Sequence, residues 1–215
     1  MTYLDIINSV LRRLREETAV SVTETDYVSM VGDFVNDAKR IVEDSYQWEA
    51  LRQTTIFNTV SGTDTYTLTD MGNRAKLISV YDQTSKYELR ALPRTKIRSE
   101  KLANPAETGT PRYYGFNGLD SNGDTNLQLH VTPDGVYSMN VLAVVPQADL
   151  SVATDAVLAP SSPIIHLALA MLARERGETG GTSTAEYFQM ADKYLRDAIA
   201  VEAARHEDEL IYYTV

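Results

Sequence analysis

The sequence of 215 residues contains no cysteine. This absence excludes disulfide bonds, thiolate metal ligands and cysteine nucleophiles. The fold therefore needs no oxidising compartment, and we expect synthesis in the cytoplasm.

Long apolar runs are also missing. No stretch reaches the roughly 18 consecutive apolar residues that indicate a membrane-spanning helix. The first residues, MTYLDIINSVLRRLREE, interrupt their apolar positions with acids and amides, which is not typical of a signal peptide. The sequence predicts no contact with a membrane.

Positive charge is scarce. Twenty Lys and Arg stand against 30 Asp and Glu, which gives a net charge of −10 and a pI near 4.8. Affinity for nucleic acid comes largely from phosphate neutralisation by Lys and Arg, so this balance disfavours a DNA-binding domain. Two interpretations remain: the charge serves solubility, or it keeps the surface from binding DNA that passes nearby.

Motifs that carry chemistry are absent as well. The three histidines, His130, His166 and His206, do not lie at metal-ligand spacing. Asp120–Asp124 begins like a calcium loop, but Thr125 occupies the position of the required glycine and Val131 that of the glutamate. The sequence predicts a turn there, and no metal or other cofactor.

Catalytic patterns are equally hard to find. No GxSxG elbow is present, and the glycines at 177–181 lack the lysine of a phosphate-binding loop. Adjacent carboxylates such as Glu43 and Asp44 point to different faces of a helix. We therefore expect no catalytic residues and a protein that is not an enzyme.

What the sequence does contain begins with helical periodicity at both ends. We expect a first helix over Thr2–Arg15, a second from a cap at Thr23 and Asp26 to Leu51, and a buried helix over Ile164–Arg176. The second would be roughly 40 Å long at 1.5 Å per residue. A last helix begins near Ser183. The expected buried positions of the first helix are Leu4, Ile7, Leu11 and Leu14, and those of the last are Phe188, Ala191, Leu195 and Ala198.

The middle of the chain alternates polar and apolar residues, as strands do. The expected strands are Thr54–Thr59, Tyr66–Leu68, Lys76–Tyr81, Tyr87–Leu89, Arg112–Phe116, Leu127–Val131 and Met139–Val145, interrupted by a helix over Pro93–Leu102. The sequence thus predicts an α+β fold. A helical platform comprises residues 1–52 and 160–209, and an inserted antiparallel β-rich sandwich or barrel-like module comprises residues 53–159.

The chain ends in a short apolar segment after three acidic residues. Thirteen tyrosines dominate the aromatic residues, and tyrosine suits partly hydrated interfaces. An apolar terminus without a local partner is either frayed or docked. We favour docking, and the expected partner-binding residues are Leu210, Ile211, Tyr212, Tyr213, Thr214 and Val215.

A helix-terminal tryptophan in Ser45–Leu51 is followed by a strand with Phe57, the Ser61-Gly62 turn, Tyr66-Thr67-Leu68 and the apolar strand Lys76–Tyr81. This succession resembles the N-terminal half of head-to-tail adaptors of short-tailed bacteriophages. The closing pattern, Pro163, an apolar helix, a polar loop and an Ala-rich helix near Tyr187-Phe188, is similar to the same group and to head-completion connectors.

The resemblance implies a structural protein of the virion, made in the host cytoplasm and placed at the head–tail interface. Its implied partners are the portal protein, a tail or nozzle protein and further copies of itself, commonly twelve in a ring. DNA would pass through the lumen without specific binding, and no membrane is involved.

Two other functions remain open from the residues. A β-rich glycan-binding or tail-fibre attachment module would present Tyr113, Tyr114 and Tyr137 to its ligand. A cell-wall hydrolase based on carboxylates has less support, because no motif indicates it.

Overall fold

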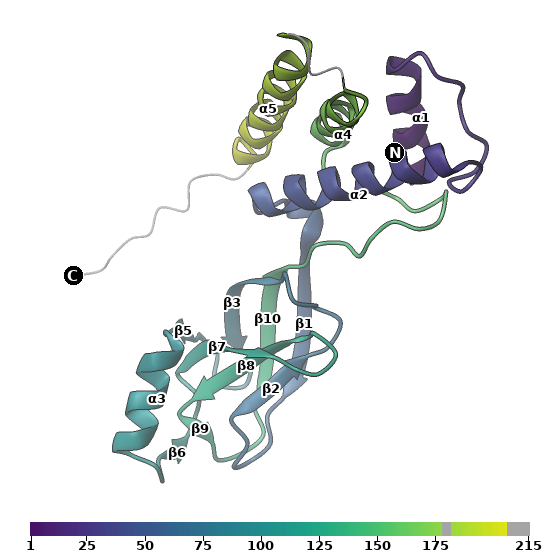
Figure 1. Ribbon diagram of the computed structural model, residues 1–215. Coiled ribbons are helices and arrows are strands. Elements are labelled where there is room, and N and C mark those ends of the chain that lie inside the picture. Colours follow the sequence, from purple (N-terminus) through teal and green to yellow (C-terminus); the bar gives the residue numbers. More distant parts are fainter. Residues whose placement is uncertain (178–181, 206–215) are drawn as a thin grey trace. The chain divides into compact units, whose positions relative to one another are not determined.

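The computed structural model describes residues 1–177 and 182–205 (Figure 1). The chain divides into two compact units, here called the helical unit (Met1–Leu51 with Gln147–Val215) and the β unit (Arg52–Pro146). The chain is α+β, as predicted. Residues 147–159, which the sequence assigned to the β-rich insert, lie with the helical unit because their backbone hydrogen-bonds to its first two helices.

Helix α1 spans Tyr3–Arg13 and begins with a reciprocal cap. The Thr2 hydroxyl accepts the Asp5 N–H at 3.2 Å, and the Asp5 carboxylate accepts the Thr2 N–H at 3.0 Å. The buried stripe is displaced from the predicted one: Leu4 and Leu14 are only partly buried, whereas Tyr3, Ile6, Ile7, Val10 and Leu11 are enclosed. The aromatic ring of Tyr3 occupies the core position expected for Leu4.

Helix α2 spans Asp26–Ser45 and is shorter than predicted. Its cap is Thr25, whose hydroxyl accepts the Val28 N–H at 3.1 Å, not the pair Thr23 and Asp26. The helix ends because Tyr46 adopts an extended backbone and the buried Trp48 indole donates to the Val42 carbonyl at 2.8 Å. Twenty residues make a helix of about 30 Å, followed by a 3₁₀ turn at Glu49–Leu51.

Helices α4 (Ser161–Glu175) and α5 (Thr182–Ala203) complete the helical unit. Helix α4 contacts α1, α2 and α5 and lies between α1 and α5 in Figure 1. It is rich in Ala, Leu and Ile, which lets three neighbours pack against it. Gly177, with φ of +74°, follows its last turn as expected of a C-terminal glycine.

The β unit contains two four-stranded sheets. The first has the order β1 (Arg52–Asn58), β10 (Ser138–Val144), β3 (Lys76–Asp82), β4 (Tyr87–Glu88) and is antiparallel. The second has the order β2 (Thr65–Leu68), β8 (Thr125–His130), β7 (Tyr113–Leu119), β5 (Arg90–Ala91). Both sheets contribute buried side chains to one core, as in a sandwich: Leu68, Val80, Leu127, Leu129, Met139 and Val141.

Two strand pairs differ from the predicted antiparallel arrangement. Strand β5 runs parallel to β7, and β6 (Thr108–Gly109) runs parallel to β9 (Thr132–Pro133). Helix α3 (Arg94–Ala103) lies in the connection from β5 to β7 and supplies the crossover that a parallel pair requires.

Candidate interaction surface of the helical unit

A buried ion pair fixes the returning chain to α2. The Lys39 ammonium lies 3.3 Å from the Glu43 carboxylate, and both side chains are fully buried. Lys39 also donates to the carbonyls of Gln147 (2.8 Å) and Ala148 (3.0 Å), while Glu43 accepts the Gln147 N–H at 3.3 Å. Residues 147–148 are thereby attached to the helix.

One turn earlier on α2, Asn36 continues the attachment. Its side-chain amide accepts the Leu150 N–H at 2.9 Å and donates to the Leu150 carbonyl at 3.1 Å. The same amide donates to the Tyr3 hydroxyl at 3.3 Å, and Tyr3 packs over Gly32. Burial, followed by the charges of nearby aspartates, raises the pKa of Tyr3 to about 12.

The next residues of the returning chain meet the start of α1. Tyr3 donates its N–H to the Asp155 carbonyl at 2.9 Å, and Val157 donates to the Met1 carbonyl at 3.0 Å. The first N–H groups of a helix have no partner within the helix, so this contact satisfies them. We call residues 147–157 the strap, because they join α1 and α2 through backbone and side-chain bonds.

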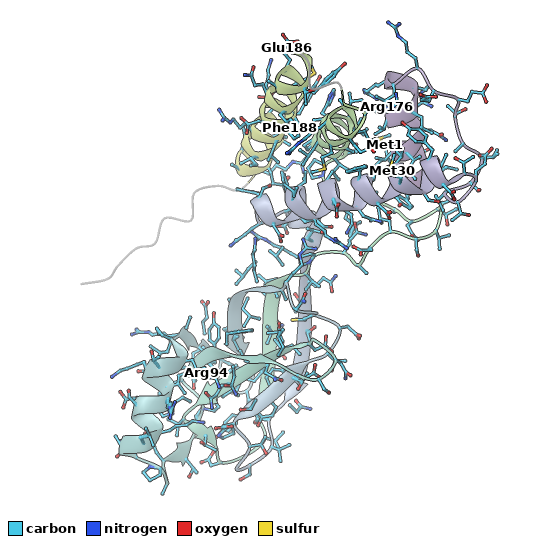
Figure 2. The ribbon with its side chains drawn as sticks, viewed as in Figure 1. Met1, Met30, Arg94, Arg176, Glu186 and Phe188 are labelled. Atoms are coloured by element: carbon cyan, nitrogen blue, oxygen red, sulfur yellow. The ribbon has the colours of Figure 1, made fainter. Side chains whose placement is uncertain are left out.

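The far end of α4 is attached to the connection between α1 and α2. Arg176 directly follows α4 (Figure 2). Its guanidinium lies 2.6 Å from Glu16, hydrogen-bonds the Tyr27 hydroxyl and lies 5.1 Å from the centre of the Tyr27 ring. Arg176 therefore holds the end of α4 against the start of α2.

The helical unit also contains an open groove of about 600 Å³ between α5, the start of α4 and the turn after α2. The buried Trp48 is one of its lining residues, and Tyr194, Val201 and Leu158 line it with 38%, 58% and 45% of their surface exposed. We call this feature the α5 groove. Large apolar side chains gathered around one depression are typical of a protein-binding surface.

The walls of the α5 groove are held by specific contacts. The His166 ring of α4 stacks on Tyr194 with 4.1 Å between ring centres, and burial is the main cause of the lowered pKa of His166. Glu202 accepts the Glu49 N–H at 2.8 Å and pairs with Arg205 at 3.0 Å. His166 thus packs between α4 and α5 beside the groove and is half-buried.

The expected partner-binding residues Leu210–Val215 lie outside the described residues, as does His206. The described part of α5 ends beside the α5 groove, which Arg205 lines. Of the predicted buried face of α5, Ala191 is enclosed, and Phe188, Leu195 and Ala198 are partly buried.

The sequence did not identify the α5 groove. Its lining comes from positions 48, 158, 194 and 201, which only the packing of α5 brings together. A signal was nevertheless present: Met190, Tyr194 and Val201 repeat on one side of α5 and were not part of its predicted buried stripe.

The remaining candidate residues of the β unit have structural roles. The Asp120 carboxylate accepts the N–H groups of Asn122 and Asp124, each at 2.8 Å, and so closes the β7–β8 turn. His130 is buried beside the Tyr113 ring.

Within residues 1–177 and 182–205, no cluster of three or more His, Asp or Glu side chains could hold a metal ion.

Of the three tyrosines in the alternative glycan-binding interpretation, Tyr114 is buried, whereas Tyr113 and Tyr137 are partly exposed. Tyr114 belongs to the buried core of the sandwich, and Tyr137 donates to Asp134 at 2.6 Å. An enclosed ring cannot stack on a sugar, so this interpretation is wrong for Tyr114.

No helix in the part of the chain that the structure describes is both long and apolar enough to cross a membrane.

Comparison with known proteins supplies the family. The model of the SU10 adaptor protein family matches residues 1–210, nearly the whole chain. No curated protein matches the chain. The match covers both halves of the helical unit and the complete β unit. The chain therefore belongs to the SU10 adaptor protein family of bacteriophage head-to-tail adaptors.

Proposed function

We propose that this adaptor forms a ring of twelve copies beneath the portal, continues the DNA channel and provides the platform for the tail or nozzle protein. The match of the adaptor family to residues 1–210 carries this proposal. The protein is made in the host cytoplasm and becomes part of the virion at the head–tail interface.

The helical unit is the part we assign to the ring. Its two chain segments are joined by the strap and by the Arg176 contact, so that it can present a rigid surface. The α5 groove gives this surface an exposed apolar region, which favours protein contact.

The C-terminal residues Leu210–Val215 are the proposed docking segment, on the portal or on an adjacent subunit. They supply three aliphatic side chains (Leu210, Ile211 and Val215) and two tyrosines directly after the acidic residues 207–209. Each large apolar side chain contributes about 1.5–3 kcal/mol on burial, before the cost of ordering the segment. In a ring, every subunit makes the same contact, so the total binding free energy is much larger than that of one contact.

The net charge of −10 supports the proposal that DNA passes through the lumen without specific binding. A protein gains affinity for DNA when its basic side chains replace the cations bound to the phosphates. This chain has more acidic than basic residues, so it gains little affinity in this way. We expect no measurable affinity for duplex DNA at moderate salt.

The test is electron microscopy of the full chain mixed with portal-bearing capsids of its phage. The expected result is a ring seated on the portal vertex, and the absence of bound chain would contradict the proposal. A variant that lacks residues 210–215 should keep its melting temperature but lose binding. A control with Glu207, Asp208 and Glu209 changed to Gln keeps the apolar segment and should still bind.

If the truncated chain joins capsids as well as the intact chain does, the docking role of residues 210–215 is wrong. The ring proposal would then remain, with its contacts elsewhere on the helical unit.

A further inference from the structure

Charge is distributed unequally between the two units. The helical unit carries 10 Lys and Arg against 21 Asp and Glu, a net charge of −11. The β unit carries 10 Lys and Arg against 9 Asp and Glu, a net charge of +1. The acidity of the chain therefore belongs entirely to one of its units.

Within the β unit, the positive charges gather in residues 86–112. This segment contains seven basic and three acidic residues, a net charge of +4. The basic residues are Lys86, Arg90, Arg94, Lys96, Arg98, Lys101 and Arg112. Arg94, labelled in Figure 2, is the first residue of α3 and lies within this segment.

Two of these cations line an open pocket of about 540 Å³ at the edge of the second sheet. Arg90 lies on the edge strand β5 and Arg112 immediately precedes β7, and the Arg90 N–H donates to the Arg112 carbonyl at 3.0 Å. We call this feature the Arg90/Arg112 pocket. Neither guanidinium has an acidic partner among the side chains that the structure describes.

The walls of the Arg90/Arg112 pocket are fixed by hydrogen bonds. The Tyr87 hydroxyl donates to the Pro111 carbonyl, and the hydroxyls of Thr110 and Tyr137 lie 3.2 Å apart. The Ser85 and Thr110 hydroxyls also line the pocket. A pocket that is lined by two arginines and several hydroxyl-bearing residues is a suitable site for a carboxylate.

We propose that the Arg90/Arg112 pocket binds exposed carboxylates on the helical unit of a second copy of this chain. The proposal deepens the proposed function, on which it rests for the presence of neighbouring copies. Charge complementarity supports it, because a surface of net −11 and a basic segment of net +4 occur on the same chain. Exposed carboxylates on α2, such as those of Asp26 and Asp33, offer the matching groups.

The observations favour a protein carboxylate over DNA phosphate. Glu88 lines the same pocket, and its carboxylate repels a polyanion with many charges more strongly than it repels a single carboxylate. Of the nearby cations, Lys96 is paired with Glu100 at 2.6 Å and Lys101 with Asp64, which leaves no continuous track of free positive charge. The net charge of −10 opposes the approach of any anion, but it opposes duplex DNA most, because DNA carries one negative charge per roughly 1.7 Å of its axis.

The test follows the side-chain Nε–H resonances of Arg90 and Arg112 in the full, isotope-labelled chain. Unlabelled chain is added at low salt, from roughly 20 μM to 1 mM, a range that detects dissociation constants up to the millimolar level. We expect both resonances to shift with concentration and the shifts to shrink in added salt.

Two variants make the test specific. R90Q/R112Q should weaken self-association at least tenfold, as expected when both charge-assisted contacts are lost. R174Q/R196Q removes the same number of exposed charges from the helical unit and should associate like the wild type.

The proposal is wrong if the wild-type resonances do not move, or if R90Q/R112Q associates as tightly as the wild type. It is also wrong if duplex DNA shifts the same resonances more strongly than the second copy does, which would indicate a phosphate site. The capsid experiment gives an independent result. If a ring forms on the portal but the Arg90 and Arg112 resonances do not shift, only the pocket contact is wrong. If the resonances shift but no ring forms on the portal, only the proposed function is wrong.

Discussion

At the scale of single residues, the helical unit depends on a charged pair that water does not reach. Lys39 and Glu43 are both fully buried, and Lys39 also satisfies two carbonyls of the strap. Removing a charge from water is costly, so each member of this pair requires the other. The ion pair explains how an acidic helix can hold a returning backbone segment.

Replacing Lys39 with Ala should lower the free energy of unfolding by about 3–5 kcal/mol, because the Glu43 carboxylate would remain buried without its partner. Urea denaturation followed by the fluorescence of the single tryptophan, Trp48, measures the change. The control is R40A, which removes an exposed ion pair with Asp149 and should cost no more than about 1 kcal/mol. Equal losses in K39A and R40A would contradict the role of burial.

Gly32 illustrates a second requirement at this scale. A Cβ atom at position 32 would overlap the Tyr3 hydroxyl, which also accepts a bond from Asn36. We expect G32A to destabilise the chain by about 1–3 kcal/mol, the usual effect of overpacking. Removal of the hydroxyl in Y3F/G32A should recover part of this loss, and a double-mutant cycle measures the coupling. Strictly additive effects would show that the two residues do not clash.

At the scale of elements, helices and longer strands could be predicted from the sequence because their side-chain period is regular. The end of α2 could not be predicted in this way, because it depends on a hydrogen bond from the Trp48 side chain to the Val42 carbonyl, which side-chain periodicity does not reveal. The parallel pairs β5–β7 and β6–β9 could not be predicted either, because β5, β6 and β9 have only two residues each, too few to show alternation. The α5 groove was missed for a related reason: its lining residues are remote in sequence.

The strap is the element whose assignment changed most. Its composition is that of a connection, and nothing in its own sequence shows that Asn36 and Lys39 of α2 bind its backbone. Sequence patterns describe local structure, whereas these bonds join residues more than 100 positions apart.

We expect N36A to release the strap while leaving the β unit unchanged. The substitution leaves both the N–H and the carbonyl of Leu150 without their partner, a loss of about 1–3 kcal/mol. Hydrogen–deuterium exchange should accelerate over residues 147–157 and stay constant at Leu127 and Val141 in the sandwich core. N8A is a suitable comparison, because Asn8 bonds Ala19 rather than the strap. Unchanged exchange in the strap of N36A would contradict this role.

At the scale of the whole molecule, the β unit is an insertion whose two ends are neighbours. Its first strand pairs with its last, in a register that places Arg52 opposite Val144. Adjacent strands lie about 4.8 Å apart, so the chain enters and leaves the β unit at nearly the same point. Each unit also has its own buried core. The topology therefore allows one unit to be removed without cutting the other.

We predict that residues 52–146 fold alone, and that residues 1–51 joined to 147–215 by a Gly/Ser linker of about four residues fold as well. Such a linker spans up to about 13 Å, more than the separation of paired strands. Dispersed NMR spectra and cooperative thermal unfolding would demonstrate both results. If either piece is unfolded on its own, the two units stabilise each other in the intact chain.

The informative control removes residues 53–159, the boundary that the sequence alone suggested. That deletion takes the strap with it, so Lys39 and Glu43 would be left as buried charges without their backbone partners and Asn36 without Leu150. The first helix would also lose the carbonyls of Ala153 and Asp155 that accept its leading N–H groups. We expect this shorter helical chain to lose cooperative unfolding, whereas the one that retains residues 147–159 keeps it. The two shortened chains differ at the second end of the deletion only by the strap and the two residues after it. Equal free energies of unfolding for both chains would therefore show that the strap does not stabilise the helical unit.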